Sequence, residues 1–133
     1  MHELNDFLAS WQATTEGNKE AFISLQQHLD QMEGVQLQFI SRPGITYSLR
    51  AKHPAQQQRE LFVMVDVIED EPRWLSVCFY QDLVSDPDEQ GDFVPGGLLG
   101  EDAICFDMET ASEKRLAYIR DRIDEACIKA RQG

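Results

Sequence analysis

The chain has 133 residues, with 24 Asp and Glu against 12 Lys and Arg, which gives a formal net charge of -12 at pH 7. This length fits a single domain over residues 1–133, and a hydrophobic fraction of 42% is typical of a folded protein rather than a disordered one. Because nucleic-acid phosphates and anionic membranes repel an acidic protein, we expect neither direct nucleic-acid binding nor membrane binding.

The N-terminal residues and the cysteines both favour a cytoplasmic protein. The first residues, MHELNDFLASWQ, are acidic where an export signal is basic, and no segment approaches the ~18 apolar residues of a transmembrane helix. The three cysteines, Cys78, Cys105 and Cys127, are odd in number, widely spaced and without a C-x-x-C motif. We therefore expect a reducing cytoplasm and three small buried thiols, with no disulfide framework and no zinc site.

Two helices are expected before residue 35. Apolar residues recur at helical spacing near the N-terminus, as Leu4, Phe7, Leu8 and Trp11. A second stripe at this spacing consists of Phe22, Leu25, Leu29 and Met32. Asn18 is expected to cap the second helix, and Gly34 is expected to end it.

From residue 35 onward the pattern changes to the alternation of β-strands. Residues 35–39 and 45–49 alternate around an Arg42-Pro43-Gly44 turn, which predicts a hairpin. Residues 61–68 are apolar at nearly every position except Asp66, as in a central strand. Residues 74–80 form the next expected strand, and residues 104–108 form a fifth after a long acidic connector.

The last part of the chain predicts one long helix, and the order of elements predicts the fold class. Residues 110–113 form a capping box ahead of an apolar stripe of Leu116, Ile119, Ile123 and Cys127. Two helices, then strands, then a helix is the order of an α+β fold. We predict a mainly antiparallel sheet of four to five strands, with the helices packed on one face and neighbouring strands paired in a meander.

Most of the negative charge lies in one region, residues 82–109, which we call the acidic segment. It holds nine acidic residues and no lysine or arginine. Residues 86–91 match the start of a calcium loop, which makes Asp86, Asp88 and Asp92 the nearest approach to metal ligands. However, Gly97 stands where that loop needs a bidentate glutamate, so we predict no metal and no cofactor. A solvated loop at the sheet edge is expected, with docking of a basic partner as the alternative.

The acidic segment also contains FVPGGLLGED, residues 93–102. Its three glycines match no phosphate-binding motif, and the neighbouring charge opposes an anionic ligand. We expect the apolar side chains of Phe93, Leu98 and Leu99 to hold this loop against the domain or against a partner, with acids such as Asp102 around them.

Alternation along the strands assigns residues to the two faces of the sheet. Those expected toward the helices are Ile45, Tyr47, Leu49, Val63, Val65, Leu75, Val77 and Phe79. Those expected on the second face are Thr46, Ser48, Arg50, Phe62, Met64, Asp66, Trp74, Ser76, Cys78, Tyr80, Cys105 and Asp107. This second face is too apolar for simple exposure to solvent and too polar for a core. Asp66 would be costly to bury alone, so a partner such as Arg50 is expected.

Three uses of the second face stay open: a homodimer interface, cover by another segment of the chain, or a small-molecule pocket built on Arg50, Asp66, Ser76 and Tyr80. The sequence contains no H-E-x-x-H, G-x-S-x-G or C-x-x-C motif. We therefore favour a non-enzymatic protein-interaction module that binds a protein partner or itself. The alternatives are a small-molecule or enzymatic site on this face, and an acidic inhibitor that mimics nucleic acid.

Overall fold

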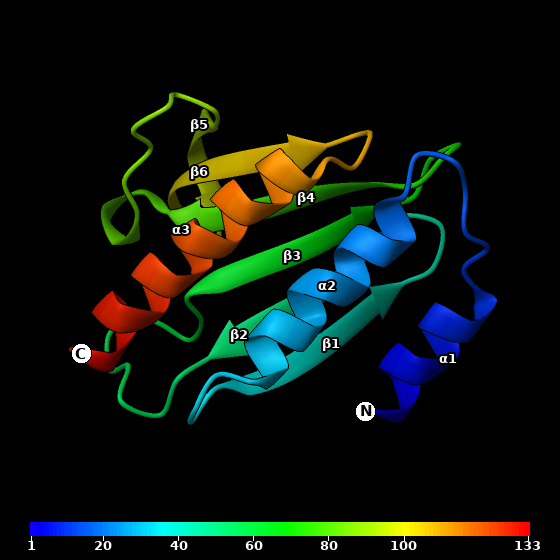
Figure 1. Ribbon diagram of the computed structural model, residues 1–133. Helices are drawn as coiled ribbons and strands as arrows, with labels where there is room; N and C mark the ends of the chain where they lie inside the picture. The colour runs from blue at the N-terminus through cyan, green and yellow to red at the C-terminus, as the bar shows by residue number, and fades with distance from the viewer.

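The chain folds into three α-helices and one six-stranded antiparallel sheet, as shown by a computed structural model that describes residues 1–133 (Figure 1). The helices are α1 (His2–Ser10), α2 (Asn18–Asp30) and α3 (Glu113–Arg131), and a short 3₁₀ helix η1 spans Gln81–Leu83. The strands are β1 (Gln36–Arg42), β2 (Thr46–Lys52), β3 (Val63–Ile68), β4 (Trp74–Tyr80), β5 (Asp92–Leu98) and β6 (Glu101–Met108). The predicted α+β class, with two N-terminal helices and a long C-terminal helix, is confirmed.

The strand order is β1-β2-β3-β4-β6-β5, and every neighbouring pair is antiparallel. Pairing of consecutive strands is therefore confirmed from β1 to β4, where the connections are short. After β4 the chain passes through η1 and residues 84–91, forms β5 at the sheet edge, and returns as β6 between β5 and β4. None of the three helices has the length and apolar character that crossing a membrane requires.

The sixth strand, β5, was not expected, because its sequence contains Pro95, Gly96 and Gly97. These residues disfavour a central strand, but an edge strand tolerates them where a bulge interrupts the ladder. The β5–β6 register shifts between Val94 and Leu98, around these three residues. A side chain at Gly97 would meet the Cβ of Val94 at 2.7 Å, so the bulge needs glycine there.

The first hairpin corrects one assignment to the core. Ile45 was expected to point toward the helices, but it is 62% exposed. It occupies the last position of the turn, where its N–H donates to the carbonyl oxygen of Arg42 at 2.9 Å. The alternation of β2 therefore begins one residue later, at Thr46.

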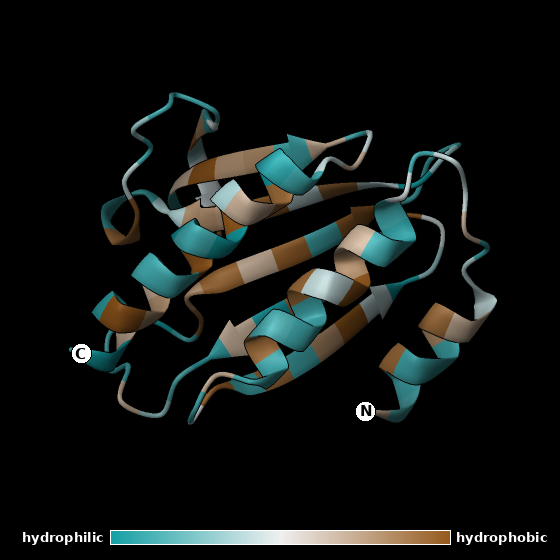
Figure 2. Ribbon diagram, in the orientation of Figure 1, coloured by the Kyte–Doolittle hydropathy of each residue, from teal (hydrophilic) through white to brown (hydrophobic).

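Helices α2 and α3 lie side by side on one face of the sheet (Figure 1). Along β3 nearly every residue is hydrophobic, with one hydrophilic interruption (Figure 2), whereas β2 alternates apolar with more polar residues. The hydrophobic set packs under the two helices; one cross-sheet row, fully buried, consists of Leu49, Val65, Val77 and Phe106. The predicted helical stripes are confirmed as core for Phe22, Leu25, Leu29, Leu116, Ile119, Ile123 and Cys127, which are all buried. Met32, the last residue of the second predicted stripe, follows the end of α2 and is only partly buried.

The helix starts differ from the predicted caps. Asn18 does not cap α2, because Gly17 is the N-cap residue and Asn18 is the first residue of the helix. Its side chain is buried and its Nδ2 donates to the carbonyl oxygens of Arg73 and Glu109. In α3 the cap is Ser112, not Thr110, since the Ser112 side chain accepts from the backbone N–H of Arg115.

Helix α1 packs against the end of the sheet through an aromatic cluster. The Phe7 ring stacks on Tyr47 at 4.3 Å between centroids and lies 5.4 Å from Trp11. The Arg73 guanidinium lies 5.1 Å from the Phe7 ring and binds the carboxylate of Glu69 at 2.9 Å. The cluster fixes α1 to the β3–β4 turn and closes this end of the core.

Candidate functional site

The side of the sheet opposite α2 and α3 carries no helix (Figure 1), and we call it the open face. Strand register places directly paired residues on the same side, so the rows of this face can be read across the strands. One row is Ile40, Ser48, Asp66, Ser76 and Asp107. The next row is Gln38, Arg50, Met64, Cys78, Cys105 and Asp92. Most of the predicted residues of the second face thus share one surface, but Phe62, which precedes β3, is fully buried.

Asp66 lies near the middle of the open face, on β3, between Ser48 on β2 and Ser76 on β4. Burial raises the pKa of its carboxyl, while Ser48 and the charges of Arg50 and Arg42 act in the opposite direction without cancelling the rise. The predicted contact with Arg50 is not direct, since the Arg50 Nε donates to the Ser48 hydroxyl at 3.2 Å. One carboxylate oxygen of Asp66, Oδ1, is buried and has no hydrogen-bond partner. The sheet therefore keeps an incompletely satisfied acid at its centre.

Because the pKa of Asp66 is raised in the folded state, its ionisation opposes folding. The folded protein holds this proton more tightly than the unfolded chain, so the free energy of unfolding falls as pH rises from about 4 through the raised pKa. We expect Asp66→Asn to raise the free energy of unfolding at pH 7 by roughly 1–2 kcal/mol, since a neutral amide is cheaper to bury. Urea unfolding at pH 7 and below pH 4 measures the effect, which disappears at the lower pH.

The control is Asp107→Asn, which makes the same change at an exposed position of the same row. It is expected to alter stability by less than about 0.5 kcal/mol at either pH. Loss of stability in Asp66→Asn at pH 7, or a gain that persists unchanged in acid, would contradict the role assigned to burial.

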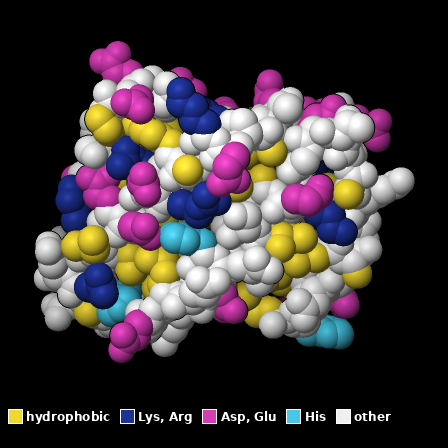
Figure 3. All heavy atoms as spheres, in the orientation of Figure 1, with side chains coloured by type: hydrophobic (Ala, Val, Ile, Leu, Met, Phe, Trp, Pro, Cys, Tyr) yellow, Lys and Arg dark blue, Asp and Glu magenta, His cyan; other side chains and the backbone are white.

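Charge is segregated on the open face. The β1–β2 half carries Arg42, Arg50 and Lys52, whereas the β6–β5 half carries Asp107 and Asp92. Between these halves lie the larger side chains Met64, Ile68 and Trp74. The helix side is different, because acidic and basic side chains are interspersed over it (Figure 3). The open face therefore has a basic side, a mainly apolar centre that holds Asp66, and an acidic side.

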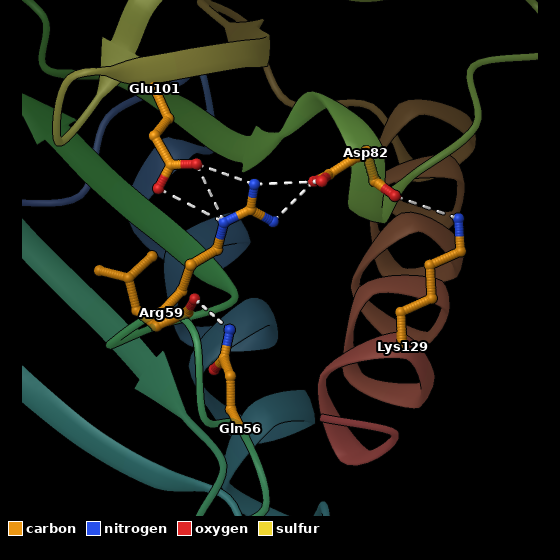
Figure 4. Close-up of polar contacts among 6 residues, drawn as sticks. Gln56, Arg59, Asp82, Glu101 and Lys129 are labelled. Atoms are coloured by element: carbon orange, nitrogen blue, oxygen red, sulfur yellow. Dashed lines mark hydrogen bonds and ion pairs between the residues drawn. The ribbon is translucent and has the colours of Figure 1, made fainter.

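One end of the open face is closed by an ion-pair network around Arg59 (Figure 4). The Arg59 guanidinium binds Asp82 at 2.6 Å and Glu101 at 2.9 Å, and its Cζ lies 4.2 Å from the centre of the Tyr80 ring. The Lys129 side chain reaches the same place, donating to the carbonyl oxygen of Asp82 at 3.4 Å. This network ties the connector before β3 to η1, β6 and α3.

Tyr80 is 2% exposed beneath Arg59, and burial raises the pKa of its hydroxyl. The four residues of the predicted small-molecule pocket are therefore divided. Arg50, Asp66 and Ser76 lie together on neighbouring strands, while Tyr80 belongs to the closed end. None of the five main surface pockets is lined by Arg50, Asp66 or Ser76. The small-molecule site stays a prediction, without Tyr80 as an accessible member.

Two further candidates, Leu99 and Asp102, lie beside Arg59 in neighbouring pockets. Tyr80 and Leu99 line a pocket of about 380 Å³, and Asp102 lines a neighbouring pocket of about 370 Å³. Both pockets share Arg59 and Glu101. The pocket around Asp102 has no hydrophobic lining residue, which is unlike the mainly apolar sites that small organic ligands occupy.

The three apolar residues that were expected to hold the β5–β6 hairpin against the domain or a partner differ in burial. Leu98 is fully buried and attaches the hairpin to the domain, whereas Phe93 and Leu99 are each 53% exposed. Leu99 has a φ of 50° in the tight turn that joins β5 to β6. Asp102 Oδ1 accepts from the backbone N–H of Gly96 at 3.1 Å, which holds the bulge. Contact of Phe93 and Leu99 with a partner stays a prediction.

The acids that match a calcium loop do not form one cluster. The Asp86 carboxylate accepts from the backbone N–H groups of Gln90 and Gly91, each at 2.9 Å, and from the Tyr118 hydroxyl. Burial alone would raise the pKa of Asp86, but these hydrogen bonds lower it below its usual value. Asp88 is exposed, and Asp92 lies on β5 opposite Cys105. No group of three or more His, Cys, Asp or Glu side chains is placed to hold a metal ion. Asp86 closes the turn before β5.

The cysteine prediction is right about burial and wrong about linkage. Cys78 and Cys105 form a disulfide across β4 and β6, with 4.1 Å between their Cα atoms. Only Cys127 is free, buried on α3. Spacing in the sequence did not predict the bond, because the two cysteines are 27 residues apart and meet only because β6, not β5, lies beside β4.

Comparison of the chain with models of protein families, with curated proteins and with solved structures gave no match.

Proposed function

We propose that this protein is a non-enzymatic interaction module, cytoplasmic as its sequence predicts, that forms a homodimer through the open face of its sheet. The observation that carries the proposal is the segregation of charge on this face. Arg42, Arg50 and Lys52 lie on one side of the mainly apolar centre, and Asp107 and Asp92 lie on the other.

A second copy of the chain fits this pattern because a two-fold axis pairs a surface with itself. An axis parallel to the strands, between β3 and β4, places β2 of one copy opposite β6 of the other. Arg50 then faces the strand that carries Asp107, and the reverse contact forms at the symmetry-related position. An axis across the strands would instead place basic residues against basic residues. Charge thus selects one orientation of the two sheets.

The size of the open face suits a dimer. Strands about 4.8 Å apart with about 3.3 Å per residue give a face of roughly 600–700 Å². Two such faces bury about 1,300 Å² in total, within the range of specific interfaces. Aligned packing of two sheets about 10 Å apart would cover Met64, Ile68 and Trp74, which are partly exposed in one copy.

The dimer is favoured over the acidic nucleic-acid mimic because the acidic segment uses many of its carboxylates internally. A mimic needs its carboxylates free to face a basic protein. Four of them instead bind groups of the same chain, namely Asp82, Asp86, Glu101 and Asp102.

Light scattering after size-exclusion chromatography of the full chain tests the proposal. We expect a dimer for the wild type, and at least a tenfold weaker dimer for Arg50→Glu or for Asp107→Arg, each of which places like charges together. The double variant, Arg50→Glu with Asp107→Arg, restores association because it exchanges the charges. Lys114→Glu makes the same charge change as Arg50→Glu at an exposed position of α3, and leaves the dimer unchanged.

Two outcomes would overturn the proposal. One is a wild-type chain that stays monomeric at about 0.1 mM, which is weaker association than an interface of this area shows. The other is a double variant that associates no better than either single variant, which would mean that these charges do not meet.

A further inference from the structure

Cys78 and Cys105 lie directly opposite each other on β4 and β6, near the middle of the open face. They are 6% and 7% exposed, and no helix covers them. Cys127, in contrast, is 2% exposed on α3, with no cysteine partner and with burial raising the pKa of its thiol. The three cysteines therefore differ in both partner and access.

We propose that Cys78 and Cys105 form a reversible oxidation site, which a low-molecular-weight disulfide such as glutathione disulfide converts between dithiol and disulfide. The two cysteines are held close together, because both belong to strands joined by a continuous antiparallel ladder. The thiols are therefore preorganised for ring closure in the folded chain, and only a small movement separates the two states. In reducing compartments, disulfides that form are mostly transient rather than structural.

The exchange is balanced in atoms and electrons. The thiolate of one cysteine attacks a sulfur of glutathione disulfide, which forms a mixed disulfide and releases one glutathione thiolate. The second protein thiolate attacks the protein sulfur of that mixed disulfide and releases the second glutathione thiolate. Two protein thiols are oxidised by two electrons, one glutathione disulfide is reduced to two thiols, and the protons pass from the protein thiols to the released thiolates.

In a single copy of the chain, before the proposed dimer covers the open face, this exchange takes place from the solvent side. Ser76, two residues before Cys78, lies with its hydroxyl 3.6 Å from the Cys78 sulfur, and Asp92 lies opposite Cys105. Ser76 is small and Asp92 is exposed, while Met64, which lies opposite Cys78 on β3, is large and partly exposed. The closed end under Arg59 begins at Tyr80, beyond the two cysteines.

The test equilibrates the folded, full-length chain in glutathione buffers from fully reduced to fully oxidised, quenches it with acid, alkylates free thiols and identifies the peptides by mass spectrometry. We expect the peptides of Cys78 and Cys105 to pass together from alkylated to linked, while Cys127 stays alkylated throughout. Dithiothreitol in native buffer should reverse the linkage. In Cys78→Ser, Cys105 should instead accumulate as the mixed disulfide with glutathione.

Several outcomes would overturn the inference: both thiols alkylated in the most oxidising buffer, linkage that includes Cys127, or a linkage that only denaturant plus reductant can open. The measurement on the wild-type chain does not depend on whether any variant folds. The same measurement is repeated on Arg50→Glu, in which the open face is expected not to be covered by a second copy. The test of the cysteine pair is therefore independent of the proposed dimer. Linkage in that variant without any dimer in the wild type would support this inference while the proposed function fails.

Discussion

Replacing Asn18 by aspartate is expected to lower the free energy of unfolding by about 3–5 kcal/mol. Asn18 is 1% exposed, and its Nδ2 donates to the carbonyl oxygens of Arg73 at 2.9 Å and Glu109 at 2.8 Å. Aspartate has no hydrogen to donate when ionised, so it would place a desolvated negative charge against two carbonyl oxygens. One side chain thus joins the start of α2 to the β3–β4 turn and to the end of β6.

Urea unfolding followed by circular dichroism measures the loss. Asn18→Ala, which leaves the two carbonyl oxygens unpaired but adds no charge, should cost less, about 1–3 kcal/mol. Asn5→Asp makes the same chemical change at an exposed position of α1 and should alter stability by less than about 0.5 kcal/mol. If Asn18→Asp were as stable as Asn5→Asp, the two hydrogen bonds would not hold these segments together.

Phe22→Ala is the second substitution with a large expected effect, a loss of about 3–5 kcal/mol in the free energy of unfolding. Phe22 is fully buried on α2, with its ring centre 6.3 Å from that of Phe7 and 5.9 Å from that of Trp11. Truncation leaves a cavity under the sheet-facing side of α2 and removes the ring contacts that join α1 to α2. Phe22→Leu fills most of the same space and should cost less than half as much.

Fluorescence separates the loosening of α1 from the loss of global stability. In a Trp74→Phe background, the remaining tryptophan is Trp11, which is 5% exposed. Phe22→Ala should shift its emission toward longer wavelength in native buffer, before any unfolding, because water reaches the ring. An unchanged emission together with a full loss of stability would place the effect in the core alone and contradict the role of Phe22 in docking α1.

Periodicity made much of the fold predictable. The stripe of Phe22, Leu25 and Leu29 predicted α2 because a helix that buries one side must repeat apolar residues every three or four positions. The near-continuous apolar run around Val65 predicted a central strand, and β3 does lie inside the sheet, although only its helix side is fully buried. Both patterns reflect local geometry, which the sequence carries within a few residues.

Edges and ends were harder to predict. Pro95, Gly96 and Gly97 disfavour a strand, yet they lie within β5, because an edge strand with a bulge tolerates the missing N–H of proline and the flexibility of glycine. Ile45 alternates correctly with Tyr47, but the turn displaces it from the core. For β5 the outcome depends on pairing with β6 at the edge of the sheet, whereas for Ile45 it depends on where the turn ends.

The candidate site was likewise predictable from the sequence in one part and not in another. Alternation alone assigned Arg50, Asp66 and Ser76 to one face, and strand register confirms that they share it. Alternation could not show that Tyr80 is covered by Arg59, since this contact joins residues 59, 80, 82 and 101 from four separate segments.

The net charge of -12 and its concentration in residues 82–109 are properties of the sequence alone, as are the α+β class and the identity of most core residues. Only the tertiary structure decided that basic and acidic residues occupy opposite sides of the open face, that β5 forms at the sheet edge, and that Cys78 meets Cys105. The reason is physical. A strand or helix that is buried on one side repeats its apolar residues with a period of 2 or 3.6, which can be read from the sequence. The order of strands in a sheet depends on pairing between distant residues, which produces no such periodic pattern.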